Sequence, residues 1–517
     1  MCVSSNTSAT PSPKIFLSNS GGPCAATSRV ISALTRNRFR LRLVWGLVAV
    51  TIVTTAPVLP ANAQNDDPPD VLFIAVDDLN DWVGVLGGHP QALTPNIDAL
   101  AARGMLFTNA HAPSALCNPS RTAIFTGLAP STTGIYGNFP DWRTLDSLED
   151  IRTIPRFFRE QGYRTYGAGK LFHAQTYSAD GFSGYNDLNA WDAFYPSLDR
   201  QLPEEVRPLD RPANGNPFSR NLDWAGLVTE DAAMADGQVV TWGSRQIAAA
   251  SGDPRFVAIG VYRPHPPWYV PKKYLDLYPV EGLALPEVLE TDLDDVPDAA
   301  LIGAFSGNMP PMGFHEWVVA NGVWREAIQA YLASVSFADA MIGELLKALD
   351  RSGRADNTII VLWSDHGWHL GEKLRWRKQT IWEESTRVPF IIVAPGVTQP
   401  GSRTNRVVSL MDLYPTLVEL AGLEIPEHVE GRSLLPLLLD PESDWQHVAL
   451  SMYGFRNHAV RSDRYRYIRY ADGSEELYDH RDDPQEWRNL ASDPGFSSIK
   501  QQHIESLPEN DAPDAAF

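Results

Sequence analysis

Four short runs of hydrophobic residues recur along the chain. They are rich in β-branched residues and do not alternate with polar positions, which is typical of strands buried on both faces, as in a parallel sheet. These runs are residues 71–76, 256–261, 358–363 and 388–394. Apolar residues with helical spacing lie between or after them, at residues 94–102, 154–161, 327–349 and 411–422. The pattern therefore predicts an α/β fold with a mostly parallel central sheet flanked by helices.

The remaining segments have other patterns. Residues 176–250 and 280–320 are rich in proline, acidic and aromatic residues, so we expect long loops and short helices there, which shape a pocket. Residues 163–166 predict a short strand that ends in a glycine-rich turn at 167–169. Residues 459–470 alternate apolar and polar positions, which predicts one half-exposed strand. The last fifteen or so residues are polar and acidic, and we expect them to be frayed.

The first 63 residues predict an export signal. They contain six basic residues and no acidic one, followed by an apolar run at 43–59 and by Ala61-Asn62-Ala63, which has the form of a cleavage site. Cleavage near Ala63 would place the mature protein in the periplasm or outside the cell. The alternative is that residues 43–59 stay as an uncleaved membrane anchor. No later segment is apolar enough to span a bilayer, so we expect no span in the mature chain.

The composition is acidic, with 43 Lys and Arg residues against 63 Asp and Glu and a net charge of −20. The export signal carries only basic charge, so its removal leaves a still more acidic chain. Such a chain is not expected to bind nucleic acid nonspecifically. An anionic substrate would therefore need a local cationic pocket.

The cysteines are equally informative. Cys2 and Cys24 lie in the predicted export signal, so Cys117 is the single cysteine of the mature chain. An exported protein with one cysteine cannot form an internal disulfide, and its thiol calls for another explanation. A buried structural cysteine is one explanation.

Polar residues follow three of the predicted strands. Asp77 and Asp78 come after residues 71–76, His265 after 256–261, and Asp365 after 358–363. The carboxyl ends of parallel strands meet at one edge of a sheet, where sites assemble. Paired carboxylates repel each other unless a cation neutralises them, and Ca²⁺ prefers oxygen ligands. The sequence therefore predicts a calcium site, with helix capping by Asp77 and Asp78 as the alternative.

The segment around Cys117 has the form C-x-P-S-R-x-x-x-x-T-G and resembles the type I sulfatases of the alkaline phosphatase superfamily. The resemblance implies that Cys117 is oxidised to formylglycine by a formylglycine-generating or anaerobic sulfatase-maturating enzyme. The hydrated aldehyde is then the nucleophile that attacks the sulfur of a sulfate ester. Pro119 suits the first turn of a helix, where free N–H groups favour an anion. Arg121 is implied to orient the nucleophile and pair with sulfate oxygens.

Further motifs follow in the order of the family. G-K-L-F-H at residues 169–173 implies that Lys170 contacts sulfate and that His173 is the base toward the formylglycine diol. His265 matches the histidine on the leaving-group side, and Lys378 matches a second sulfate-binding lysine. The implied metal ligands are Asp77, Asp78, Cys117 as formylglycine, Asp365 and His366, although many sulfatases carry Asn in place of this histidine. Taken alone, an exposed lysine and a packed histidine would be the simpler interpretation of Lys170 and His173. For His265, a structural loop histidine is the alternative.

The resemblance also divides the chain. It implies a sulfatase catalytic domain at residues 64–435 and a small antiparallel C-terminal subdomain at 436–517. The forms G-K-L-F-H, P-H-x-P and S-D-H-G-W look most like the iduronate-2-sulfatase branch, which implies hydrolysis of a 2-O-sulfate on a uronic-acid-containing glycan. The substrate would be a sulfated oligosaccharide or a small sulfate ester. Two alternatives remain: a phosphodiesterase or phosphonate hydrolase of the same superfamily, or a catalytically dead, secreted glycan-binding protein.

Overall fold

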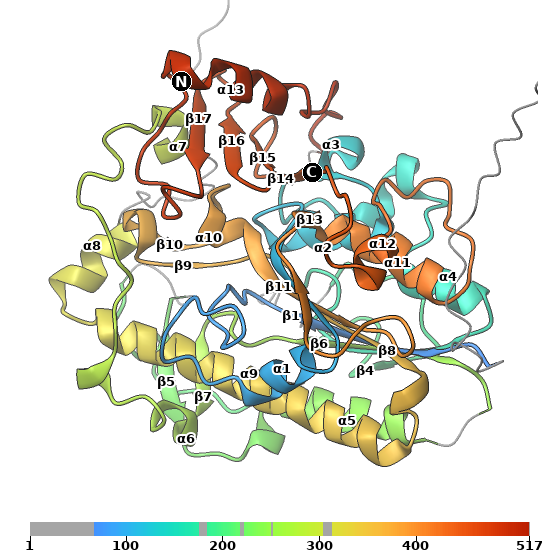
Figure 1. The fold of residues 1–517 in the computed structure, drawn as a ribbon. Helices are drawn as coiled ribbons and strands as arrows, with labels where there is room; N and C mark the ends of the chain where they lie inside the picture. The colour runs from blue at the N-terminus through green and yellow to red at the C-terminus, as the bar shows by residue number, and fades with distance from the viewer. Residues whose placement is uncertain (1–66, 175–183, 218–221, 250–251, 303–312, 516–517) are drawn as a thin grey trace, which may run out of the picture. The chain divides into compact units, whose positions relative to one another are not determined.

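A computed structural model describes residues 67–174, 184–217, 222–249, 252–302 and 313–515 (Figure 1). The predicted export signal lies outside the described residues. All described residues belong to one compact unit. Among the described residues, no helix combines the length and apolar character needed to cross a membrane.

A central sheet organises the fold. Its strands are β1 (Asp70–Val76), β2 (Met105–His111), β3 (Arg164–Gly169), β4 (Ala193–Tyr195), β6 (Arg255–Val261), β8 (Thr358–Ser364), β11 (Arg387–Val393), β12 (Ser402–Thr404) and β13 (Val408–Ser409). Across the described residues the order is β12-β2-β11-β8-β1-β6-β3-β4, with β13 paired to β2. All pairs are parallel except those of β11 with β2 and β8. The predicted mostly parallel sheet is confirmed.

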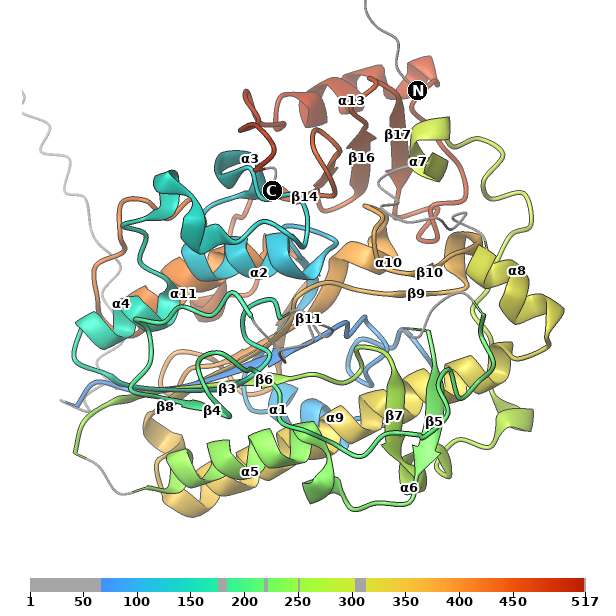
Figure 2. The same ribbon diagram turned by 180° about the vertical axis from the view of Figure 1, so that it is seen from behind.

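Helices cover both faces of this sheet. One layer contains α1 (Pro95–Ala101), α5 (Ala235–Ala248) and α9 (Trp324–Ser352), and the other contains α2 (Cys117–Thr126), α4 (Ile154–Glu160), α11 (Leu413–Leu420) and α12 (Leu435–Leu439). Figures 1 and 2 show these two layers on opposite sides of the strands. A hydrophobic core lies on each face of the sheet, and strand β1 contributes side chains to both. The core on the side of α9 contains Leu72, Ile74 and Val76, and the core on the side of α2 contains Val71, Phe73 and Ala75. This explains why the sequence of β1 is continuously hydrophobic.

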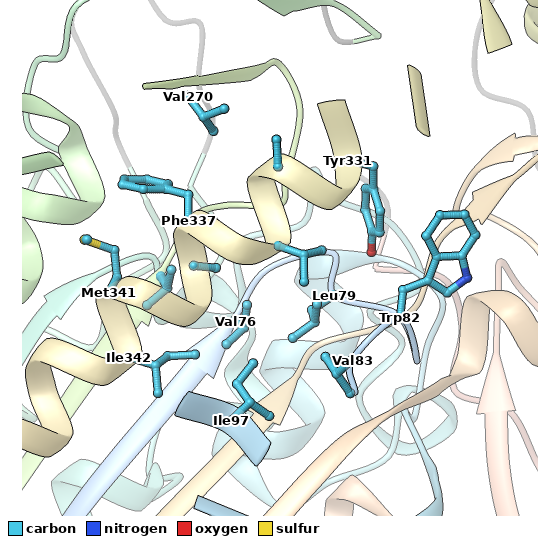
Figure 3. Close-up of a cluster of buried hydrophobic side chains, with 14 of the residues drawn as sticks. Val76, Leu79, Trp82, Val83, Ile97, Val270, Tyr331, Phe337, Met341 and Ile342 are labelled. Atoms are coloured by element: carbon cyan, nitrogen blue, oxygen red, sulfur yellow. The ribbon is translucent and has the colours of Figure 1, made fainter. Parts of the chain in front are cut away.

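Helix α9 fixes the loop that follows β1. Figure 3 shows Leu79, Trp82 and Val83 of this loop packed beside the face of α9 that carries Tyr331. The Tyr331 hydroxyl donates to the carbonyl of Asp78 at 2.9 Å and accepts from the N–H of Asn80 at 3.0 Å. The position of Asp77 and Asp78 after β1 is therefore fixed by the packing and hydrogen bonding of this loop against α9.

A smaller antiparallel sheet forms the C-terminal part. Its strands are β14 (Ala449–Met452), β15 (His458–Arg461), β16 (Tyr465–Arg469) and β17 (Glu475–Asp479), paired in chain order, and α13 (Ser497–Ile504) follows (Figure 1). The expectation of a single half-exposed strand at 459–470 is wrong, because the chain turns between β15 and β16. Both faces are buried: Ala459 and Ile468 pack in one cluster, and Val460 and Tyr467 in another.

The end of the chain differs from the expected frayed tail. The N–H of Ala512 donates to the carbonyl of Ser131 at 2.7 Å, and that of Ala515 donates to Gly134 at 2.8 Å. Ser131 lies in α3 (Pro130–Thr133), and Gly134 directly follows this helix. The C-terminal residues are therefore hydrogen-bonded to the segment around α3. The domain limits at residues 63 and 435 stay predictions.

Several other elements differ from the sequence predictions. Strand β3 continues through Gly167 to Gly169, where we expected a turn, because Gly169 (φ 74°) and Gly260 let two strand ends come closer than a Cβ allows. Helix α5 lies in a segment expected to hold loops and short helices. Gly237 and Gly243 weaken its helical pattern, but Gly243 lets α5 pack directly on Ile259 of β6. The remaining elements are β5 (Trp224–Leu227), β7 (Trp268–Pro271), β9 (His369–Leu370), β10 (Trp376–Arg377), α6 (Lys272–Leu275), α7 (Asp298–Ile302), α8 (Gly313–Ala320) and α10 (Glu383–Thr386), together with short 3-10 turns.

Candidate active site

The carboxyl ends of four adjacent parallel strands, β8, β1, β6 and β3, lie at one edge of the sheet. Each is followed by predicted site residues. These are Asp365 and His366 after β8, Asp77 and Asp78 after β1, His265 after β6, and Lys170 and His173 after β3. Cys117 and Arg121 come from α2, after β2, and Lys378 follows β10. Contacts link all ten residues around the Cys117 thiol.

Cys117 is the first residue of α2 and is buried, with 1% of its surface exposed. The predicted helix with Pro119 in its first turn is confirmed. The free N–H groups expected at the helix start are not all free, because Asn118 N–H donates to Asn138 Oδ1 at 3.0 Å. The Asn118 side chain also donates to the carbonyls of Gly137 and Pro140. These hydrogen bonds to residues 137–140 fix the position of the start of α2.

Basic groups surround the thiol. The Cys117 Sγ lies 2.9 Å from Lys378 Nζ, 3.3 Å from His366 Nε2 and 3.7 Å from Lys170 Nζ. Burial alone would raise the pKa of the thiol, but the charges of Lys170 and Lys378 outweigh it and hold this pKa well below its usual value. The position therefore stabilises negative charge on the side chain at residue 117 or on a group bound to it.

Three buried carboxylates balance three buried cations. Arg121 Nε donates to Asp365 Oδ2 at 2.8 Å, and its terminal nitrogens reach Asp77 Oδ1 at 3.2 Å and the carbonyl of Lys170 at 2.6 Å. Lys170 pairs with Asp77, and Lys378 Nζ lies 2.5 Å from Asp78 Oδ1. Burial opposes ionisation of Asp365, but the Arg121 charge lowers the pKa of this carboxyl. Arg121 is thus a fixed part of the site, oriented by two carboxylates.

The ligand atoms fit a divalent cation. One atom each from Asp77, Cys117, Asp365 and His366 lies within 4.8 Å of the others, and Asp78, Cys117 and His265 form a second such group. Asp78 Oδ2 is buried and accepts no hydrogen bond from the described residues. Asp78 has φ 60°, a strained value for a residue other than glycine, and its N–H donates to Asp365 Oδ1 at 3.1 Å. The three carboxylates, one of which has an unsatisfied oxygen, suit a hard cation, whereas the thiol and the imidazoles are softer donors.

The two histidines occupy different positions. His173 is 8% exposed, and burial lowers the pKa of its imidazole, although the side chain is hydrogen-bonded to Cys117. The His265 side chain is 17% exposed, and its Nε2 lies 3.8 Å from Asp78 Oδ2. Its Nδ1 lies 2.6 Å from the Pro266 carbonyl, so Nδ1 carries a proton and Nε2 faces the site. Both histidines, and Lys170 at 2% exposure, belong to the site.

The sequence analysis did not predict the buried polar interactions that position the loop containing His265. Asp236 of α5 is fully buried and accepts hydrogen bonds from the N–H groups of Tyr262 and Arg263, at 2.5 and 3.3 Å. Arg263 pairs with Glu205 at 2.8 Å, and the Tyr262 ring packs on His265 with centroids 4.7 Å apart. Because α5 was not predicted, no sequence pattern connected Asp236 with the His265 loop.

Comparison with known proteins identifies the class. The profile of the sulfatase family matches residues 69–423, and the profile described as N-sulphoglucosamine sulphohydrolase, C-terminal, matches residues 371–512. The chain belongs to the sulfatase family, whose members hydrolyse sulfate esters. The protein is a sulfatase with an alkaline-phosphatase-like fold.

Individual proteins are also similar to this chain. A protein named Sulfatase from Formosa agariphila is 40% identical over 450 residues, which cover 86% of this chain and 87% of the relative. Iduronate 2-sulfatase from Homo sapiens is 31% identical over 456 residues, covering 76% of this chain and 78% of the relative. Among solved structures, the phosphonate monoester hydrolase of Agrobacterium radiobacter superposes with a TM-score of 0.71 at 23% identity, covering 85% of this chain and 94% of that one. The last likeness concerns the fold.

Proposed function

We propose that this sulfatase removes a 2-O-sulfate from a uronic-acid-containing glycan, with a formylglycine made from Cys117. The observation that carries the mechanism is the position of Cys117 Sγ, 2.9 Å from Lys378 Nζ and beside Lys170, His366 and His173. The similarity to iduronate 2-sulfatase supports the substrate class.

The roles of the residues follow from their positions. As formylglycine, residue 117 would supply the hydrated aldehyde that attacks sulfur. Lys170 and Lys378 would hold the sulfate oxygens, and Arg121 would orient the nucleophile. His173 would take a proton from the side chain at residue 117, and His265 Nε2 would give one to the leaving alcohol.

A divalent cation, for which we propose Ca²⁺, would be held by Asp77, Asp78, Asp365 and His366 together with the side chain at residue 117. It would withdraw charge from a sulfate oxygen. Three carboxylates and the free Asp78 oxygen favour an oxygen-preferring ion, whereas His366 Nε2 is a softer donor, 3.4 Å from both Asp78 Oδ1 and Asp365 Oδ2.

Maturation gives the first test. Protein co-produced with a formylglycine-generating or anaerobic sulfatase-maturating enzyme is digested with trypsin, and the peptide ending at Arg121 is weighed. We expect the mass loss that converts a thiol to an aldehyde, and Cys117→Ala should abolish turnover without unfolding the protein. Active enzyme that retains an unmodified thiol would refute the nucleophile, and matured enzyme inactive on every sulfate ester would support a glycan-binding protein.

The central atom of the substrate gives the second test. We expect kcat/KM to be higher for an aryl sulfate than for the matching aryl phosphate diester or phosphonate, and highest for a 2-O-sulfated uronic-acid oligosaccharide. A preference for the phosphorus ester would establish the phosphonate hydrolase alternative, which the fold alone accommodates. N-terminal sequencing of the exported protein tests the proposed cleavage near Ala63.

A further inference from the structure

The basic run at residues 373–378 contains side chains with different tasks. Lys373 is 3% exposed and pairs with Asp292 at 2.8 Å. Arg375 is 2% exposed, donates to the Ala300 carbonyl at 2.5 Å and stacks on Trp382, with 5.1 Å from its Cζ to the ring. Both are therefore parts of the interior, and neither is the solvated surface charge that a basic run suggests.

Arg377 is different. Its side chain makes no hydrogen bond and no ion pair with the described residues, and its Nε is buried. The side chain is partly exposed, and its Cζ lies 5.6 Å from the ring of Phe314. The backbone has φ 81°, a strained value that breaks the regular alternation of strand side chains. An arginine fork is thus held in place with its hydrogen-bonding capacity unused.

The residue that follows this fork in the sequence is part of the candidate active site. The next residue, Lys378, contacts both Cys117 and Asp78, so Asp78 already has its ammonium partner. Burial lowers the pKa of the Arg377 guanidinium, while the charges of Asp78, Tyr453 and Cys117 act in the opposite direction. The negative groups around residue 117 therefore act on Arg377, and no carboxylate of the described residues forms an ion pair with it.

We propose that Arg377 binds the carboxylate of the uronic acid whose sulfate is removed. This inference rests on the proposed function. A guanidinium offers two parallel N–H donors that match a carboxylate, and such charge-assisted pairs are the strongest hydrogen bonds in proteins. A partly buried cation without a partner is unfavourable until an anion arrives. The carboxylate and the 2-O-sulfate belong to one sugar ring, so two neighbouring cations, Arg377 and Lys378, can hold both at a fixed separation.

The experiment compares three substrates: a 2-O-sulfated uronic-acid disaccharide, the same disaccharide with the carboxylate converted to an amide, and 4-nitrophenyl sulfate. The enzymes are the matured wild type, Arg377→Gln and Arg377→Lys. Arg351→Gln is the control, because Arg351 is exposed in the last turn of α9. Thermal unfolding of every variant shows that each is folded.

We expect Arg377→Gln to lower kcat/KM on the uronate by roughly 10- to 100-fold, the range of a hydrogen bond to a charged group. Turnover of 4-nitrophenyl sulfate and of the amide should change less than about threefold, since neither offers the carboxylate. Arg377→Lys should recover only part of the loss because it lacks the fork. Arg351→Gln should match the wild type on all three substrates.

Two outcomes overturn the inference while leaving the proposed function in place: an equal loss on all substrates, or no loss on the uronate. If wild-type enzyme cleaves 4-nitrophenyl sulfate but neither disaccharide, the proposed substrate class fails, and the inference fails with it. If wild type cleaves the uronate and the amide equally well, the site does not recognise the carboxylate, and only the inference is refuted.

Discussion

Replacing Lys378 with methionine should separate catalysis from stability. Lys378 is 5% exposed, and its Nζ lies 2.5 Å from Asp78 Oδ1 and 2.9 Å from Cys117 Sγ. Methionine keeps much of the volume of the side chain but removes the charge. The ammonium is a fixed donor at the point where negative charge gathers, so its loss should be large.

The magnitude follows from two separate effects. Removing one such donor costs about 10²- to 10³-fold in turnover, or about 2.7–4 kcal/mol. Removing one partner of a buried ion pair costs about 3–5 kcal/mol of folding stability, because the other charge stays buried. In the variant, Asp78 Oδ1 would still lie 3.4 Å from His366 Nε2. Because the carboxylate keeps this neighbour, we expect the loss of stability to lie at the lower end of the range.

Lys373 provides a matched control. It is 3% exposed and pairs with Asp292 at 2.8 Å, so it is a second buried lysine–aspartate pair, five residues away in the sequence. Lys373→Met should lose a similar amount of stability while keeping kcat/KM within about threefold of wild type, since it does not contact the reacting group.

The assay is steady-state hydrolysis of 4-nitrophenyl sulfate together with urea unfolding monitored by fluorescence. Both variants are measured at a temperature at which each is fully folded. If Lys373→Met loses as much kcat/KM as Lys378→Met, the loss reflects general destabilisation. If Lys378→Met keeps near wild-type turnover, Lys378 does not hold the sulfate.

Two further predictions concern the metal and salt. Asp365→Asn should lose bound Ca²⁺ and activity together, as measured by metal analysis and turnover, and chelation of the wild type should do the same until Ca²⁺ is restored. Asp292→Asn, a buried carboxylate away from the site, should keep the metal, and full activity of metal-free wild type would contradict the assignment. Moderate salt should leave kcat/KM on a sulfated glycan unchanged or raise it, because the acidic chain repels a polyanion over a Debye length of about 8 Å. A steep fall across a salt series would instead indicate an extended basic capture surface.

The parts of the site that follow from periodicity are those at strand ends. Continuous hydrophobic runs located β1, β6 and β8, and parallel pairing brings Asp77, Asp365 and His265 to one edge. Lys170 and Lys378 could not be found in this way. The periodicity of hydrophobic residues does not distinguish a lysine that contacts Cys117 from a lysine exposed to solvent. Their assignment came from the resemblance to sulfatases, and their contacts with Cys117 came from the structure.

The basic run at 373–378 shows where pattern analysis fails. Lys373, Leu374 and Arg377 all have positive φ, so side-chain direction does not follow the alternation of a strand. The sequence therefore could not show that Arg375 donates to the Ala300 carbonyl while Arg377 Nε has no hydrogen-bond partner in the described part of the chain. The alternation at residues 459–470 predicted neither the turn between β15 and β16 nor the burial of both faces of their sheet.

The charges of the site explain why metal and substrate should bind together. Asp77, Asp78 and Asp365 carry three negative charges, which Arg121, Lys170 and Lys378 balance within a buried cluster. A sulfate ester entering alone would add a negative charge at low dielectric, which is unfavourable. A divalent cation more than offsets that charge, so the affinity for each should rise when the other is bound, by the same factor in both directions. In its proposed role, Arg377 would extend this balance to the carboxylate of a uronate, the second anionic group of the proposed substrate.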